Sequence, residues 1–334
     1  MSVTLFKCPH CGGVIKIHEE FGICLECNTS YPIHESVINF VNEELSSAVE
    51  QTTEAFGWQW NHTMYGHTTG SIHYGEDLFF SRYHLSKEEL ITLIQGKIVL
   101  DPAVGSGRVE HIFGKYPKLV YANDLSNAIY AAKKNLSAFG FDNIVYLRSN
   151  MQKLPFEDNF FDVVICHATL QHVENPKRAL ESLLSKVKKG GVILFDLYKK
   201  AAPIRDYCDD FIRQKISDLQ PKQAYEEVLK LSKLGQSLRE QNITITIPCD
   251  IPFLEIEAGE YDLQRFFYYK ILKMFWNDGM SLEENHTVNF DWYYPKISPR
   301  FSEEEVHSML KDLNVDVIDF KATEGGIGVI IQKH

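Results

Sequence analysis

Four cysteines near the start of the chain have the residue type and spacing of a metal site. Two residues separate Cys8 from Cys11 and Cys24 from Cys27, and twelve residues lie between the two pairs. Each pair can turn two thiolates toward one ion, and the two pairs together complete the tetrahedral four-thiolate shell that zinc prefers. Because such a shell leaves no position open for water, we expect a zinc ion with a structural role.

A glycine-containing loop further along the chain has the pattern of a nucleotide site. The apolar run at residues 97–101 ends in Asp101, the loop carries Ala103, Gly105 and Gly107, and a segment of helical character follows. Small residues allow the backbone to approach a ligand closely, and the free N–H groups at a helix start favour polar or anionic groups. The sequence therefore predicts a strand, a glycine loop and a helix around a bound nucleotide.

A second apolar run, at residues 119–122, leads to Asp124, and an acid at the tip of this strand can accept both hydroxyls of a ribose. A dinucleotide dehydrogenase and an S-adenosylmethionine enzyme both use this arrangement. A dehydrogenase needs a third glycine for helix packing, and here Val109 and Glu110 follow the loop without one. Asp101, directly before the loop, also disfavours a diphosphate and favours an ammonium group nearby.

The stretch Val99-Leu100-Asp101-x-Ala103-x-Gly105-x-Gly107 is similar to motif I of class I S-adenosylmethionine-dependent methyltransferases. The resemblance extends over residues 95–198 and 300–334, and the segment after residue 167 resembles the small-molecule branch of the family. It implies S-adenosylmethionine as the cofactor and S-adenosylhomocysteine as the product. The resemblance places these residues around the cofactor: Asp101, Ala103, Gly105, Gly107, Asp124, Leu125, Asn150, Met151, Gln152 and His167.

Two of these positions depart from the family pattern. The family usually has glycine where Ala103 stands, although a small residue is kept. The family also usually has aspartate where Asn150 stands, before the turn that binds adenine. The amide of Asn150 can still accept a hydrogen bond from the adenine amino group, with less charge assistance. Met151 would then pack on the adenine face.

Alternating apolar runs and helical segments predict an α/β fold with a Rossmann-like, seven-stranded methyltransferase sheet. A helix capped by Asn175 is expected to run to Lys189 and to end at Gly190 and Gly191, and Ser302 is expected to cap the last helix. The resemblance implies that the last two strands form an antiparallel pair. The expected strands lie at residues 97–101, 119–122, 143–150, 162–167, 192–196, 315–320 and 328–332.

We expect five regions along the chain. The first resembles the small zinc-ribbon activator proteins that partner several tRNA and protein methyltransferases, so a protein partner bound through the ribbon is an expectation. An aromatic cluster at residues 56–62 and 65–67 either packs against the sheet or ribbon or lines the cleft. The regions are a zinc ribbon (1–41), an N-terminal helical aromatic segment (42–95), the cofactor-binding core (96–198), a helical and aromatic cap insertion (199–290) and the C-terminal part of the core (291–334).

Histidines after the fourth expected strand are the first candidates for a general base. His167 and His172 stand there, and the alternative for His172 is a residue that packs a helix. Asp291 and Tyr293, in an acidic and aromatic stretch before the last helix, are further catalytic candidates. Methyl transfer is direct displacement at the sulfonium methyl, so a base is needed only if the acceptor keeps a proton.

The charge and hydropathy of the chain narrow the choice of acceptor. The 34 Lys and Arg residues against 45 Asp and Glu residues give a formal net charge of −11, which repels phosphate backbones and anionic membranes. No apolar run is long enough to span a bilayer, and the N-terminus has no signal pattern, so we expect a cytoplasmic protein. The predicted function is methyl transfer to a small molecule or biosynthetic intermediate. The alternatives are an rRNA or tRNA methyltransferase and a non-catalytic partner protein that binds S-adenosylmethionine.

Overall fold

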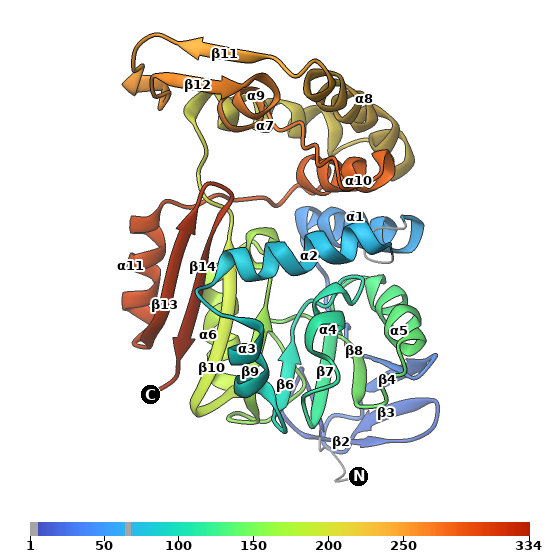
Figure 1. The fold of residues 1–334 in the computed structure, drawn as a ribbon. Coiled ribbons are helices and arrows are strands. Elements are labelled where there is room, and N and C mark those ends of the chain that lie inside the picture. Colours follow the sequence, from blue (N-terminus) through green and yellow to red (C-terminus); the bar gives the residue numbers. More distant parts are fainter. Residues whose placement is uncertain (1–5, 64–67) are drawn as a thin grey trace.

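The computed structural model describes residues 6–63 and 68–334 and is built around one twisted β-sheet (Figure 1). Within the described residues, the core strands follow the order β8-β7-β6-β9-β10-β14-β13. All neighbours pair in parallel up to β10, and β14 is antiparallel to both β10 and β13. This arrangement confirms the predicted seven-stranded methyltransferase sheet. Its strands are β6 (Ile98–Asp101), β7 (Leu119–Asp124), β8 (Ile144–Arg148), β9 (Phe161–Cys166), β10 (Val187–Leu197), β13 (Asp316–Thr323) and β14 (Gly326–Gln332).

The N-terminal cysteine-rich region extends this sheet. Its last strand pairs in parallel with β8, with Ile38 opposite Leu147, so the ribbon continues the sheet at one edge. Phe6, Tyr31 and Phe40 of this region belong to the same buried hydrophobic cluster as residues of the core strands. The ribbon therefore shares its apolar interior with the core. Its strands are β1 (Phe6–Lys7), β2 (Val14–Ile17), β3 (Phe21–Cys24), β4 (Ser30–His34) and β5 (Val37–Asn39).

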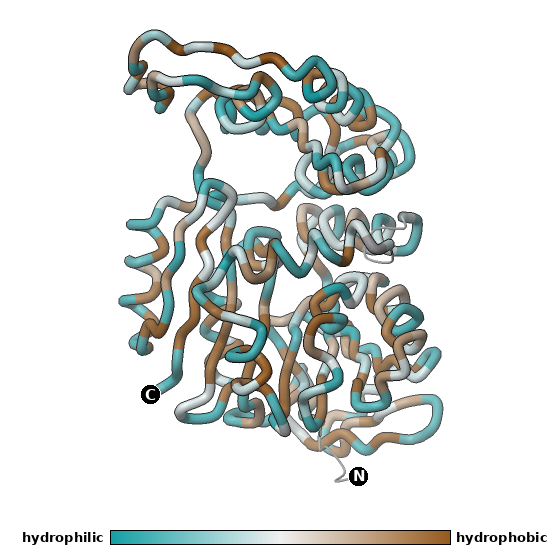
Figure 2. The backbone as a smooth tube through the Cα atoms, viewed as in Figure 1, coloured by the Kyte–Doolittle hydropathy of each residue, from teal (hydrophilic) through white to brown (hydrophobic). Residues whose placement is uncertain are grey.

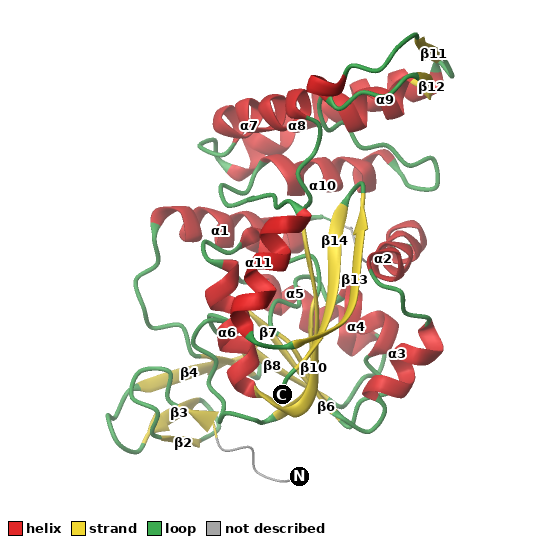
Figure 3. Cartoon of the chain, turned by 90° about the vertical axis from the view of Figure 1, so that its left-hand side faces the viewer, coloured by secondary structure: helices red, strands yellow, loops and turns green. Residues whose placement is uncertain are grey.

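Helices cover both faces of the core sheet. Helices α6 (Pro176–Lys186) and α11 (Glu303–Leu313) lie on one face, and α3 (Lys87–Ile94) and α4 (Arg108–Phe113) lie on the other (Figure 3). Helix α5 (Ala128–Ala138) packs on β7 and β8. Strands buried on both faces must be apolar throughout, and Figure 2 shows hydrophobic residues concentrated along them.

The end of helix α6 differs from the expectation. The helix ends at Lys186, not at Lys189, and residues from Val187 onward belong to β10. Val187 is fully buried and pairs with Phe161, whereas Gly190 turns the backbone with φ of 73° before the regular pairing resumes at Val192. Burial of a β-branched side chain against the sheet therefore ends the helix one turn early.

A cap formed by residues after β10 lies over the carboxyl ends of the strands (Figure 1). Helices α1 (Ser47–His62) and α2 (Thr69–Arg82) lie between the cap and the sheet. The predicted boundary between residues 290 and 291 falls inside helix α10, which packs on α8 and so belongs to the cap. The cap contains α7 (Pro203–Ile216), α8 (Pro221–Glu240), β11 (Thr244–Ile247), β12 (Gly259–Asp262), α9 (Leu263–Lys270) and α10 (Leu282–Tyr293).

Short 3₁₀ turns at Leu170–His172 and Pro252–Leu254 complete the described secondary structure. Ser302 caps α11 through a reciprocal capping box with Glu305, as the sequence predicts. Among the described residues, no helix combines the length and the apolar character needed to cross a lipid bilayer.

Candidate active site and zinc site

The four N-terminal cysteines converge on one point. Their sulfur atoms all lie within 4.8 Å of one another, with Cys8 and Cys27 3.6 Å apart and Cys11 and Cys24 3.5 Å apart. A tetrahedral zinc ion with Zn–S bonds of about 2.3 Å requires sulfur atoms about 3.8 Å apart. The predicted ligands therefore come together with the spacing that a four-thiolate zinc site needs.

Groups around the cysteines support the same geometry. The Tyr31 hydroxyl lies 3.0 Å from the Cys8 sulfur, and the Thr29 hydroxyl lies 3.1 Å from the Cys27 sulfur. A side chain at Gly13 would place its Cβ 3.0 Å from the Cys24 sulfur, so the knuckle has no room for one. Hydroxyl groups that can donate to thiolates orient metal ligands from outside the first shell.

A large cavity of about 780 Å³ lies between the sheet and the cap. Its floor consists of the carboxyl ends of the core strands, and its upper wall consists of cap residues. Cofactor pockets of α/β sheets occupy this position because the strands and helix N-termini point their polar groups there. Every predicted cofactor residue lines it except Gly107: Asp101, Ala103, Gly105, Asp124, Leu125, Asn150, Met151, Gln152 and His167.

The glycine loop has the backbone that its sequence requires. Gly105 and Gly107 have φ of 55° and 84°, in the left-handed region that side chains disfavour. A Cβ on Gly107 would lie 2.8 Å from the Cγ atom of Leu136, so this glycine allows α4 and α5 to pack closely. Gly107 is therefore a positioning residue of the loop, whereas Gly105 borders the cavity beside Trp60.

Asp124 is tied to the glycine loop. Its carboxylate accepts hydrogen bonds from the Gly105 N–H at 2.9 Å, the Ser126 N–H at 2.8 Å and the Ser126 hydroxyl at 2.6 Å. An ionised carboxylate has about four acceptor positions, so about one remains for a ribose hydroxyl in this conformation. Accepting both hydroxyls, as the sequence suggested, requires one of these internal bonds to be given up.

Two carboxyl groups lie side by side beneath the loop. Burial raises the pKa of Asp101 to about 7, with the nearby Asp124 acting in the same direction. Burial and the charge of Asp101 raise the pKa of Glu110 well above its ordinary value. Both Glu110 oxygens lack a hydrogen-bond partner among the described residues. A pair of buried carboxyls favours a cation beside it, which fits the ammonium group of S-adenosylmethionine.

The expected adenine pocket is formed by the loop after β8. Asn150 accepts from the Gln152 N–H at 2.9 Å and donates to Glu43 at 2.8 Å, so one acceptor position of its amide oxygen stays available. Met151 is buried, and its carbonyl accepts a hydrogen bond from Ser182. Leu125 also lines the cavity and is half-buried, and its carbonyl accepts a hydrogen bond from Arg148 Nε at 3.0 Å.

Two predicted catalytic residues come together in the cavity. His172 Nδ1 lies 2.8 Å from the carbonyl oxygen of Ile297, which assigns the proton to Nδ1 and leaves Nε2 as an acceptor. The Tyr198 hydroxyl lies 3.5 Å from both His172 Nε2 and Asp291 Oδ2, and Gln59 donates to Asp291 Oδ1 at 3.3 Å. Burial lowers the pKa of His172, so its imidazole is neutral and can accept a proton at pH 7.

His167 takes a different position. Its side chain is 1% exposed, packs edge-on against Phe79, and places Nδ1 3.3 Å from Asp196. Although burial alone would raise the pKa of Asp196, His167, Arg82 and the Ala168 N–H lower it to about 2. The Nε2 atom of His167 is screened from solvent and has no partner in the described part of the chain. His167 therefore borders the cavity without presenting its ring to it.

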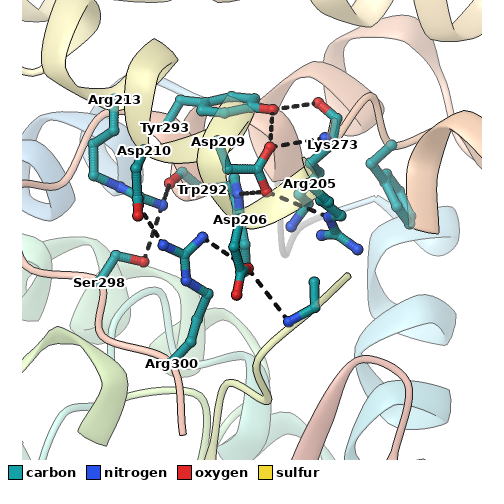
Figure 4. A network of polar contacts seen from close by, with 12 residues as sticks. Arg205, Asp206, Asp209, Asp210, Arg213, Lys273, Trp292, Tyr293, Ser298 and Arg300 are labelled. Atoms are coloured by element: carbon teal, nitrogen blue, oxygen red, sulfur yellow. Dashed lines mark hydrogen bonds and ion pairs between the residues drawn. The ribbon is translucent and has the colours of Figure 1, made fainter. Parts of the chain in front are cut away.

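Tyr293 does not face the cavity. It is fully buried, and its hydroxyl donates to Asp209 at 2.7 Å and lies 2.8 Å from the carbonyl of Lys273 (Figure 4). The neighbouring Trp292 lines the cavity, because side chains one residue apart on a helix point about 100° apart. The expectation that Tyr293 takes part in catalysis is therefore corrected to a role in holding the cap together.

Part of the aromatic cluster before the core lines the cavity, as one of the two expectations had it, but Trp58 packs on the cap and not on the sheet or ribbon. Phe56 and Trp60 line the cavity, whereas Trp58 packs against Phe290 and Tyr225 of the cap. Tyr65 and His67 lie outside the described residues.

Several cavity residues were not predicted from the sequence. Asp196 ends the fifth strand at the same sheet edge as Asp101 and Asp124, and this position was a usable signal. Tyr198 follows it by two residues. Arg205 and Lys273 come from the cap, and no periodicity in the sequence indicates that these distant cations meet.

The fold and the glycine loop define a class of enzyme, and comparison with known proteins agrees with it. Residues 100–195 match the family model described as a methyltransferase domain. Residues 100–195 are therefore assigned to a methyltransferase domain, and the sheet around them has the fold of the class I S-adenosylmethionine-dependent methyltransferases.

Similar proteins include methyltransferases of quinone biosynthesis from Coxiella burnetii. A ubiquinone biosynthesis O-methyltransferase (strain RSA 331 / Henzerling II) is 25% identical over 181 residues, which are 53% of this chain and 76% of the relative. A ubiquinone/menaquinone biosynthesis C-methyltransferase (strain Dugway 5J108-111) is 29% identical over 131 residues, 37% of this chain and 52% of the relative. The solved DhpI–SAH complex aligns with a TM-score of 0.47 at 14% identity, covering 87% of this chain and 98% of that one.

Proposed function

We propose that this protein transfers a methyl group from S-adenosylmethionine to a small molecule held between the sheet and the cap. The observation that carries the proposal is the continuous cavity of about 780 Å³, which joins the glycine loop to a proton acceptor and to the cap wall. A volume in this range suits a cofactor together with a small acceptor. The alternatives are an RNA substrate and a non-catalytic partner role, and an activity assay with both kinds of acceptor distinguishes them from this proposal.

When bound, S-adenosylmethionine supplies an electrophilic methyl group on a sulfonium centre. The Asp101 carboxyl, with Glu110 buried beside it, would attract its ammonium group. Asp124 would accept from the ribose, and Asn150 and Met151 would hold the adenine. Gly105 permits the close approach of the backbone. These residues would hold the cofactor in a fixed position beside the acceptor, and such positioning supplies much of the rate.

His172 takes the acceptor's proton in this proposal. Its Nε2 would accept the proton as the acceptor oxygen or nitrogen bonds to the methyl carbon and the carbon–sulfur bond breaks, which leaves neutral S-adenosylhomocysteine. The Ile297 carbonyl keeps the ring oriented through Nδ1–H. Burial and the charge of Asp291 raise the pKa of Tyr198 well above its ordinary value, so Tyr198 stays protonated and donates toward His172 or Asp291. Asp291 then stabilises the imidazolium that forms.

The decisive experiment measures S-adenosylhomocysteine formation by the full chain with S-adenosylmethionine and separate panels of small metabolites and tRNA or rRNA. We expect turnover with a small metabolite, a loss of about 100-fold or more in kcat for His172→Gln, and unchanged cofactor affinity. His307→Gln, at an exposed histidine, is the matched control. Turnover with RNA alone, or cofactor binding with no turnover at all, would contradict the proposal.

We also propose that the four cysteines bind one structural zinc ion and that the ribbon supports its own catalytic core. The pairing of β5 with β8 and the shared hydrophobic cluster support this role. Metal analysis of the reduced, full-length protein should find about one equivalent of zinc, with much less in the Cys24→Ser variant. Far less than one equivalent in the unaltered protein would contradict the zinc assignment.

A further inference from the structure

The cap wall of the cavity carries two buried cationic side chains. Arg205, on α7, is 5% exposed, and Lys273, in the connection between α9 and α10, is 7% exposed. Both line the same cavity as the glycine loop and His172. Burying a charge is costly unless partners compensate it. The contacts of Arg205 and Lys273 therefore show whether the protein itself compensates their charges.

Asp209 is the buried acid of this wall, and its acceptor positions are used up (Figure 4). It accepts from Arg205 Nε at 3.3 Å, Trp292 Nε1 at 2.9 Å, the Tyr293 hydroxyl at 2.7 Å and the Lys273 backbone N–H at 2.9 Å. These bonds fill the roughly four acceptor positions of a carboxylate. Asp209 therefore holds the wall in place and has no acceptor position left for the other donors.

The charged ends of the two cations lie over aromatic rings. The terminal nitrogens of Arg205 and the Lys273 ammonium have no hydrogen-bond or ion-pair partner among the described residues. Instead, Lys273 Nζ lies 4.1 Å and Arg205 Cζ lies 5.4 Å from the centre of the Trp292 ring, and Arg205 Cζ also lies 4.7 Å from the Tyr268 ring. Aromatic faces stabilise cations without occupying their N–H groups. The guanidinium of Arg205 and the ammonium of Lys273 can therefore still donate hydrogen bonds to a ligand in the cavity.

The lowered pKa of the Lys273 side chain is consistent with a binding site for an anion beside it. Burial and the Arg205 charge lower the pKa of Lys273 to about 7, although Asp291 and Asp209 act in the opposite direction. A negative group beside Lys273 would restore its positive charge. Asp209 and Tyr293 form hydrogen bonds with the backbone of Lys273, and these bonds fix the position of its Cα atom.

We propose that Arg205 and Lys273 bind the carboxylate of the methyl acceptor, so that the substrate is a small organic acid. This inference rests on the proposed function. A planar guanidinium edge and an ammonium group match a carboxylate, and a monoanion suits a wall where Asp209 already compensates one of two cations. Tyr198 packs on Trp292 with ring centres 4.6 Å apart, so the anion site adjoins the His172 proton acceptor. The methylated atom of the acceptor therefore lies a short distance from its carboxylate.

The test uses the full chain saturated with S-adenosylhomocysteine and a panel of small aromatic and aliphatic carboxylates. Each acid is paired with its primary amide and with a phosphate ester of similar shape, and binding is followed by ligand-observed NMR and calorimetry. We expect saturable binding of some carboxylates, at least tenfold weaker binding of their amides, and at least tenfold weaker carboxylate binding to Lys273→Met. Lys273→Arg, which keeps the charge, should retain most of the affinity.

Lys222→Met, at an exposed lysine of α8, is the matched control and should bind as the unaltered protein does. S-adenosylhomocysteine affinity should stay within about twofold in Lys273→Met, which also verifies folding. If the cofactor product binds but acids and amides bind equally, or phosphate esters bind best, the carboxylate proposal is overturned. If S-adenosylhomocysteine itself does not bind to the unaltered protein, the result contradicts the proposed methyltransferase function, on which the carboxylate proposal rests.

Discussion

The replacement of Asp209 by asparagine tests how the cap is held together. The Asp209 carboxylate is fully buried on α7 and connects that helix to the Lys273 segment and to α10. Asparagine keeps the shape of the side chain but removes the negative charge and converts one acceptor oxygen into a donor. Whichever way the amide is oriented, two of the four bound donors then face an N–H₂ group.

The structure gives the size of the effect. Removing one partner of a buried ion pair costs about 3–5 kcal/mol, because the other charge stays buried without compensation. Each buried donor left without an acceptor costs about 1–3 kcal/mol, and these contributions overlap with the first. We therefore expect Asp209→Asn to lower the free energy of unfolding of the cap by about 3–5 kcal/mol.

Urea unfolding followed by tryptophan fluorescence measures this loss, because Trp276 and Trp292 belong to the cap and Trp58 packs against it. Far-ultraviolet circular dichroism reports separately on the whole chain. Asp210→Asn is the matched control on the neighbouring residue, since the Asp210 side chain is 52% exposed and its ion pairs contribute about 1 kcal/mol or less. Equal, small losses for both variants would refute the role given to Asp209.

Three further predictions concern the zinc site and the glycine loop. Chelation of zinc should lower the melting temperature of the whole chain, because the ribbon shares a hydrophobic cluster with the core, and an unchanged melting temperature would contradict that coupling. Because burial raises the pKa of Glu110, the contribution of this group to the free energy of unfolding should be largest below its unfolded pKa of about 4.3 and be lost as the pH rises through its folded pKa. Glu110→Gln should therefore be more stable than the unaltered protein at pH 8, with a smaller difference at pH 6 in urea titrations, whereas a difference that grows toward acid would refute the sign. Gly107→Ala should destabilise the chain by about 1–3 kcal/mol more than Gly96→Ala, because both glycines have positive φ but only Gly107 would press its Cβ against Leu136.

The sequence predicted the core sheet well because its signals are local. Most core strands are short apolar runs, and β6 and β7 end in the acids Asp101 and Asp124 that marked them in the sequence. The cysteine spacing predicted the convergence of four sulfur atoms for the same reason, since two short knuckles define most of the geometry. The exact end of α6 was missed because a tertiary contact, the pairing of Val187 with Phe161, decides it.

The cap side of the site could not be predicted, because it depends on contacts between distant segments. Asp291 and Tyr293 are two residues apart in the sequence, yet one reaches the cavity and the other is buried against Asp209. Likewise, nothing local shows that Lys273 meets Arg205 over the ring of Trp292. Such juxtapositions follow from how helices of an insertion pack, for which a single sequence has no periodic signal.

The most direct test of the central claim is calorimetric titration of the full chain with S-adenosylhomocysteine, alongside the Asp124→Asn variant. We predict one site with micromolar affinity, and at least tenfold weaker binding to the variant, whose melting temperature shows whether the loop is still folded. The absence of measurable binding by the unaltered protein, or equal binding by a folded Asp124→Asn variant, would contradict the assignment of the cofactor to the glycine loop.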